Sequence, residues 1–128
     1  MTDLICKDLC MTFRNATTGA KVEALKDINF ELKEGEILTV LGPSGCGKTT
    51  LLNMIAGFIT PTSGDLILGD RQIDGPGAER GMVFQQGALF EWLTVARNVD
   101  FGLRMRGANQ SQTNEKVESW LDTVGLQG

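Results

Sequence analysis

Residues 41–50 read LGPSGCGKTT, and this stretch decides the fold. It matches the pattern G-x-x-x-x-G-K-[ST] through Gly42, Gly47, Lys48 and Thr49. Small residues let the chain wrap around a phosphate so that successive backbone N–H groups point inward. A β-favouring apolar run at 36–41 precedes the motif, and apolar residues at helical spacing follow it. A strand, a glycine loop and a helix in this order are the context that phosphate binding requires.

The loop supplies three kinds of phosphate contact. The helix that begins there adds the positive end of its dipole, and Lys48 adds a full charge for the terminal phosphates. The Thr49 hydroxyl is suited to coordinate Mg²⁺. A plain glycine-rich turn is the structural alternative. We therefore predict a nucleoside triphosphate with Mg²⁺ as the ligand, held by Gly42, Ser44, Gly45, Cys46, Gly47, Lys48, Thr49 and Thr50.

The rest of the chain places strand signals before the loop and helix signals near the C-terminal end. The patterns predict strands at 4–13, 22–25, 28–32, 36–41, 65–70 and 81–85, and helices at 51–58 and on both sides of Gly107. Asp70 ends an apolar run but is followed by Arg71, so a hairpin turn is its better interpretation. The order of elements predicts an α/β fold.

Bulk properties exclude several classes of protein. The net charge of −4 argues against nucleic-acid binding, which normally uses a basic face. No apolar run approaches the ~20 residues that span a bilayer, so we expect no direct membrane insertion. Three cysteines without a CxxC pair, and no histidine, make a zinc site improbable. These features favour a cytoplasmic protein.

GPSGCGKTT also fits G-x-x-G-x-G-K-[ST], which nucleoside-monophosphate kinases share with transporter ATPases. Such kinases usually place the loop directly after their first strand. Here some 40 residues rich in strand signals come first. A small phosphotransferase and a nucleotide-binding module without turnover remain as alternatives.

With these residues in hand, the chain resembles the ATP-binding subunit of an ABC transporter through essentially all 128 residues. The similarity runs along LKDINFELKEGEILTVLGPSGCGKTTLLNMIAGFITPTSGDLILGD, and ERGMVFQ resembles the strand that leads into the glutamine loop. Within that family, residues 75–107 are similar to importers for nitrate, sulfonate and taurine. The resemblance implies a truncated P-loop NTPase fold of the ABC type. It also implies a nucleotide-binding core with an antiparallel β subdomain at 1–88, and the start of the helical subdomain at 89–128.

The resemblance also implies roles for single residues. Phe13 matches the aromatic that stacks on adenine, and Val22 matches an apolar residue beside the ribose or base; a strand-end core role is the alternative for Phe13. Gln85 matches the glutamine that touches Mg²⁺ or the attacking water. Lys48 and Gln85 are thus the candidate catalytic residues, and Thr49 and Gln85 the candidate metal ligands.

Partners follow from the same resemblance. Leu89, Phe90 and Trp92 fall where the family docks its membrane permease, although an internal packing loop would explain them equally well. A second ATPase subunit is the other expected partner. The protein would then be peripheral to the inner or plasma membrane.

Hydrolysis in this family needs more than the phosphate loop. The chain lacks the aspartate–glutamate pair after an apolar strand (Walker B), a signature resembling LSGGQ and the switch histidine. We therefore expect it to bind ATP without efficient hydrolysis.

Overall fold

A computed structural model describes residues 2–126. These residues form two compact units, one up to Met82 and one from Val83 onward. The described helices include none that is long and apolar enough to cross a membrane.

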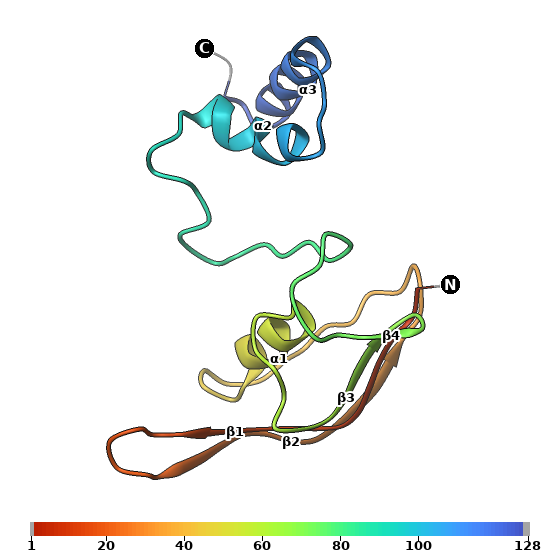
Figure 1. The fold of residues 1–128 in the computed structure, drawn as a ribbon, viewed down its shortest axis with the longest axis vertical. Coiled ribbons are helices and arrows are strands. Elements are labelled where there is room, and N and C mark those ends of the chain that lie inside the picture. The colour runs from red at the N-terminus through yellow and green to blue at the C-terminus, as the bar shows by residue number, and fades with distance from the viewer. Residues whose placement is uncertain (1, 127–128) are drawn as a thin grey trace. The chain divides into compact units, whose positions relative to one another are not determined.

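The first unit is built on an antiparallel sheet (Figure 1). Its strands, in the spatial order β2-β1-β3-β4, are β1 (Leu4–Arg14), β2 (Lys21–Leu32), β3 (Ser63–Leu68) and β4 (Arg71–Gln72). A loop closes the long β1–β2 hairpin, where the Asn15 carboxamide accepts hydrogen bonds from the N–H groups of Thr17 and Thr18 at 2.9 and 3.0 Å. Asp70 lies in the β3–β4 turn, as its sequence context predicts.

Bulges interrupt the β1–β2 ladder. Asp8 and Asp27 both have left-handed backbones, with φ of 47° and 48°. The pairing register shifts three times, between Cys6 and Leu9, between Leu9 and Met11, and after Met11. The predicted strands at 22–25 and 28–32 are therefore wrong as separate elements. They form one strand that the bulge at Asp27 bends rather than ends.

Helix α1 (Lys48–Ile55) covers the core of this unit. Its buried residues, Leu51 and Met54, pack into a cluster with strand side chains that include Leu9, which is fully buried. The predicted helix at 51–58 begins earlier and ends sooner, because Gly57 adopts φ 82° directly after the C-cap. The core sits between α1 and one face of the sheet.

Two predicted strands are wrong. Residues 36–41 and 81–85 have no strand structure, although their composition favours it. Ile37, Leu41 and Val83 are 93, 87 and 97% exposed. A buried strand needs hydrogen-bonding neighbours, and no described strand pairs with either segment. Residue type alone therefore does not make these segments strands.

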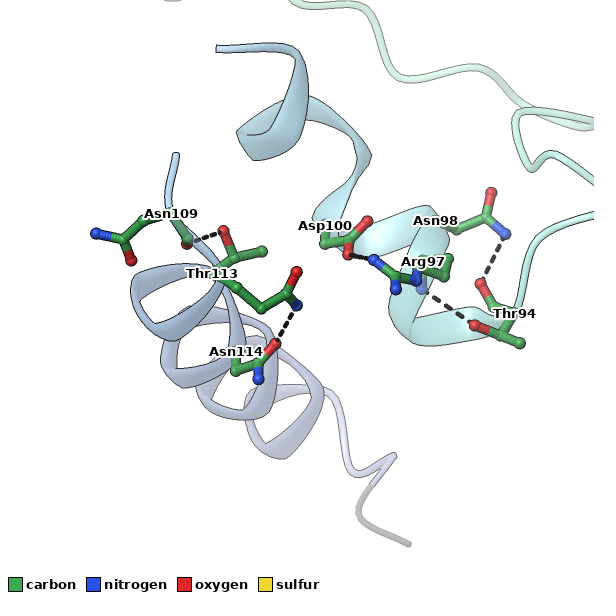
Figure 2. A network of polar contacts seen from close by, with 8 residues as sticks. Thr94, Arg97, Asn98, Asp100, Asn109, Thr113 and Asn114 are labelled. Carbon is green, nitrogen blue, oxygen red and sulfur yellow. Dashed lines mark hydrogen bonds and ion pairs between the residues drawn. The ribbon is translucent and has the colours of Figure 1, made fainter. Parts of the chain in front are cut away.

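The second unit is a pair of helices, α2 (Val95–Met105) and α3 (Gln110–Thr123), on the two sides of Gly107 as predicted. Both helices have side-chain N-caps. Thr94 accepts from the N–H of Arg97 (Figure 2), and Asn109 accepts from the N–H of Gln112. Thr113 and Val117 on α3 are buried.

Candidate phosphate-binding site

The glycine loop joins residues 36–41 to α1 in the first unit. Gly45 and Gly47 adopt left-handed backbones, with φ of 81° and 94°. The N–H of Cys46 donates to the carbonyl of Pro43 at 3.4 Å, which makes a tight turn inside the loop. The loop therefore has a curled backbone with little side-chain bulk, as the sequence predicts.

Lys48 places its ammonium group on this loop. Its Nζ donates to the carbonyl oxygens of Gly42 and Pro43, each at 2.7 Å, and lies 3.3 Å from the Cys46 sulfur. The positive charge is thus held at the loop itself, where it can exchange a carbonyl oxygen for a phosphate oxygen.

The N-terminus of α1 offers free backbone donors. The N-cap is Gly47, which has no side-chain oxygen, and no cap hydrogen bond forms there. The N–H groups of the first turn, Lys48 to Thr50, accordingly have no intrahelical partner. The first turn also contains no acidic residue. A helix start with unpaired N–H groups, no acid and an adjacent ammonium favours an anion.

Gly47 packs directly against strand β2. A Cβ atom on Gly47 would lie 2.5 Å from the Ala24 carbonyl oxygen and 2.8 Å from Leu25 Cδ2. Only glycine allows this approach, which fixes the end of the loop on the sheet. The glycine is therefore required by packing as well as by the backbone angle.

Phe13 and Val22 face each other across the β1–β2 hairpin. Their Cα atoms are register partners, and the side chains are 41 and 59% exposed. Val22 lies two residues from Ala24, against which the loop packs. Val22 and the residues that contact Gly47 thus lie close together along β2, and Phe13 is the register partner of Val22 on β1. The exposure of Phe13 argues against the alternative of a core phenylalanine.

The two candidate metal ligands belong to different units. Thr49 is exposed in the first turn of α1, where its hydroxyl is a hard oxygen donor of the kind that Mg²⁺ takes. Gln85 is exposed in irregular chain of the second unit. The catalytic and metal-binding roles of Gln85 stay predictions.

The residues predicted to contact a partner lie before α2. Leu89 and Trp92 are exposed. The ring of Phe90 packs at a tilt against those of Trp92 and Phe101, with ring centroids 5.3 and 4.6 Å apart. An almost wholly apolar pocket of about 490 Å³ lies beside them in the second unit. It is lined by Leu89, Phe90, Glu91, Leu93, Val95, Asn98, Val99, Trp120, Leu121, Val124 and Leu126.

Asn98 organises this segment, which the sequence did not indicate. Its Oδ1 accepts from the N–H of Phe90 at 2.8 Å, and its Nδ2 donates to the carbonyls of Phe90, Leu93 and Thr94 at 3.0–3.1 Å. Figure 2 shows the bond to Thr94. An asparagine one turn into a helix that follows an aromatic loop is the signal that could have suggested it.

With this geometry established, comparison with known proteins identifies the family. Residues 25–128 match the ABC transporter family. The chain belongs to the ABC transporter family. The ABC ATPase fold, with its antiparallel sheet and following helices, is confirmed by the dimeric post-hydrolysis structure of the ATP-binding cassette MJ0796 bound to ADP and Pi. That structure superposes with a TM-score of 0.81 at 29% identity, over 97% of this chain and 58% of that one.

Relatives within the ABC family narrow the resemblance. The chain is 66% identical over all its 128 residues to the taurine import ATP-binding protein TauB of Pelagibacter ubique, and covers 48% of it. It is 57% identical to TauB of Roseobacter denitrificans, over 99% of this chain and 47% of that protein. The predicted similarity to taurine-type importers is confirmed. The chain spans about half the length of these relatives.

One thiol of this ABC chain lies within the sheet. Cys6 is buried and donates from Sγ to the Ile28 carbonyl at 3.2 Å. Burial raises the pKa of this thiol from 9.0 to about 11. Cys6 is accordingly a packing residue, whereas Cys46 is exposed in the phosphate loop.

Proposed function

We propose that this chain is the ATP-binding part of the energy-coupling subunit of an importer for taurine, or for a similar small solute such as nitrate or a sulfonate. The observation that carries the proposal is the glycine loop with Lys48 on its carbonyls, beside a helix start that no side chain caps. The names of the relatives supply the solute class.

The residues of the first unit divide the work of binding ATP. The ammonium of Lys48 and the N–H groups of the first helical turn neutralise the phosphates. The exposed Thr49 hydroxyl would hold Mg²⁺, which screens the phosphate charge when bound. Phe13 stacks on adenine, and Val22 contacts the ribose or base. Each of these groups lies on α1, on the loop or on the hairpin next to it.

Turnover by these 128 residues alone should be negligible. The chain has no histidine and no acidic pair after an apolar strand, and the family needs both groups for hydrolysis. In the proposed role, Gln85 would contact Mg²⁺ or the attacking water. Phosphate release that Lys48→Ala abolishes would contradict this expectation.

The second unit supplies the contact with the permease. Leu89 and Trp92 are exposed beside an apolar pocket of about 490 Å³, and the ring of Phe90 packs against that of Trp92. Such an apolar surface suits a partner helix. The protein would then sit at the cytoplasmic face of the membrane through the permease, with a second ATPase subunit as its other partner.

Calorimetric titration of Mg-ATP into the purified chain tests the proposal. Lys48→Ala should weaken binding at least tenfold, because a charged hydrogen bond contributes about 1.5–3 kcal/mol. Lys26→Ala is the matched control, since it removes the same charge from an exposed β2 side chain paired only loosely with Glu23 at 3.9 Å. Equal effects of the two variants would refute a specific role of the loop, and absence of binding by the folded chain would refute ATP binding by this part of the protein.

A further inference from the structure

The first bulge of the hairpin decides which face of the sheet β1 residues occupy. Before it, Leu4 and Cys6 are buried, and after it Leu9 and Met11 are buried. The buried residues of β1 thus have even numbers before Asp8 and odd numbers after it. A one-residue change of register moves every following side chain to the opposite face. The partial alternation of this stretch in the sequence has its cause here.

The change of parity extends to Phe13. Phe13 follows Met11 by two residues with no further extra residue on β1, so it shares the face of the buried Met11. Between Ile28 and Val22, strand β2 contains residues that have no partner on β1. Because of them, the side chain of Val22, the register partner of Phe13, lies on the same face as Phe13. This is the face on which α1 and the Gly47 end of the phosphate loop pack. Without the bulge at Asp8, Phe13 would point away from the loop.

Side chains of the neighbouring strand hold both bulges. The N–H of Asp8, displaced from the ladder, donates to Asn29 Oδ1 at 2.9 Å, and Asn29 Nδ2 donates to the Asp27 carbonyl at 3.1 Å. One carboxamide therefore ties the two left-handed residues together. The N–H of Asp27 in turn donates to the Cys10 sulfur at 3.3 Å.

The other neighbour of the bulge allows it by lacking a side chain. Gly64 on β3 has φ 84°, and a Cβ there would lie 2.3 Å from the Asp8 carbonyl oxygen. The bulge is thus accommodated on both sides, by a side chain of β2 and by a glycine of β3.

We propose that Asn29 is a positioning residue for nucleotide-base recognition, acting by clamping the Asp8 and Asp27 bulges so that Phe13 faces the phosphate loop. The proposal rests on the proposed function in that Phe13 is the base-stacking residue. Phe13 is half exposed, so its orientation contributes little to the stability of the core. A change in its orientation should therefore be detected as a change in the preference for ATP over a ligand without a base. Asn29 itself touches no ligand in this scheme.

The test compares Mg-ATP with magnesium triphosphate, which lacks the base, in Asn29→Ala and Asn29→Asp. Aspartate keeps the oxygen that accepts from the Asp8 N–H but loses the donor to the Asp27 carbonyl, whereas alanine loses both halves of the clamp. In the wild type, ATP should bind on the order of tenfold more tightly than triphosphate, the usual contribution of an aromatic stack, and Asn29→Asp should keep a smaller preference for ATP. In Asn29→Ala this ratio should fall towards one while triphosphate affinity is unchanged. An unchanged ratio, or an equal loss of both ligands, would overturn the proposal.

A ligand-free measurement separates this proposal from the proposed function. The NMR cross-peak between the Phe13 ring and the Val22 methyl groups reports the register of the hairpin. It should be weaker in Asn29→Asp, which keeps only the bond to Asp8, and should disappear in Asn29→Ala. Its persistence in Asn29→Ala refutes the clamp even if no nucleotide binds. If Asn29→Ala fails to fold, Asp8→Gly is added to it. Glycine relieves the left-handed strain at φ 47° but does not replace the clamp.

Discussion

Replacing Gly47 by alanine should destabilise the first unit more than the same change at either other glycine of the loop. The left-handed backbone at φ 94° costs an alanine about 1–2 kcal/mol. The added Cβ would also lie 2.5 Å from the Ala24 carbonyl oxygen and 2.8 Å from the side chain of the buried Leu25. Overpacking of this kind typically costs about 1–3 kcal/mol, so we expect a total of about 2–5 kcal/mol.

Two matched variants separate the contributions. Gly45→Ala meets the same backbone penalty at φ 81°, but no atom lies within 4 Å of its Cβ, so only this penalty of about 1–2 kcal/mol is expected. Gly42→Ala lies outside the left-handed region and meets only the Cys46 sulfur at 2.6 Å, a side-chain end that can rotate away. Its effect on stability should be the smallest of the three.

Amide hydrogen exchange of β1 and β2 measures these differences directly. Tryptophan fluorescence cannot, because Trp92 and Trp120 both lie in the second unit. The free energies of exchange should decrease in the order Gly42→Ala, Gly45→Ala, Gly47→Ala. If Gly47→Ala were as stable as Gly45→Ala, the loop would not pack on β2, and the anchoring of the phosphate site to the hairpin would be wrong.

Three further predictions follow from other contacts. The pKa of Cys6 is raised from 9.0 to about 11, so the neutral thiol contributes stability that is complete below pH 9 and is lost as the pH rises towards 11. Cys6→Ala should therefore reduce the fall of the denaturation midpoint between pH 9 and about 11. An unchanged fall of the midpoint in this range would contradict the burial of the thiol. Asn98→Ala should lower the stability of the second unit by about 2–4 kcal/mol in tryptophan-monitored unfolding, because four hydrogen bonds are lost. The control Asn114→Ala removes one exposed bond to Gln110 and should change this stability little. Alkylation of the exposed Cys46 should weaken Mg-ATP binding and should be slowed by bound nucleotide; normal affinity of the modified protein would show that the thiol lies away from the phosphates.

Local sequence signals were sufficient for the loop and the helices. The glycine–lysine pattern carries its own backbone requirements, and both Gly45 and Gly47 have the left-handed angles it implies. Helices α2 and α3 form where the sequence places them because their hydrogen bonds are internal and their caps, Thr94 and Asn109, are neighbours in sequence. Such elements need no distant partner in order to be recognised.

Local sequence did not predict which apolar runs form strands or where the bulges lie. Residues 36–41 have the composition of a buried strand, yet strand structure requires a neighbouring strand that a local pattern does not reveal. The Asp8 bulge depends on Asn29 and Gly64, which are 21 and 56 residues away along the chain. Only the broken alternation of β1 signalled it, and that signal does not say which residue is the extra one.

The phosphate loop is anchored more firmly at one end than at the other. At the α1 end, Gly47 packs on β2 and Leu51 is buried in the core. At the other end, residues 36–41 form no ladder, and a space of about 370 Å³ separates part of this segment from β2 and α1. The bonds from Lys48 to the carbonyls of Gly42 and Pro43 therefore hold this end of the loop, together with the turn bond from the Cys46 N–H to the Pro43 carbonyl. Removing Lys48 eliminates a phosphate contact and also leaves the loop open, so ATP must then order it at an entropic cost. The affinity lost in Lys48→Ala should accordingly exceed the ~1.5–3 kcal/mol of a single charged hydrogen bond.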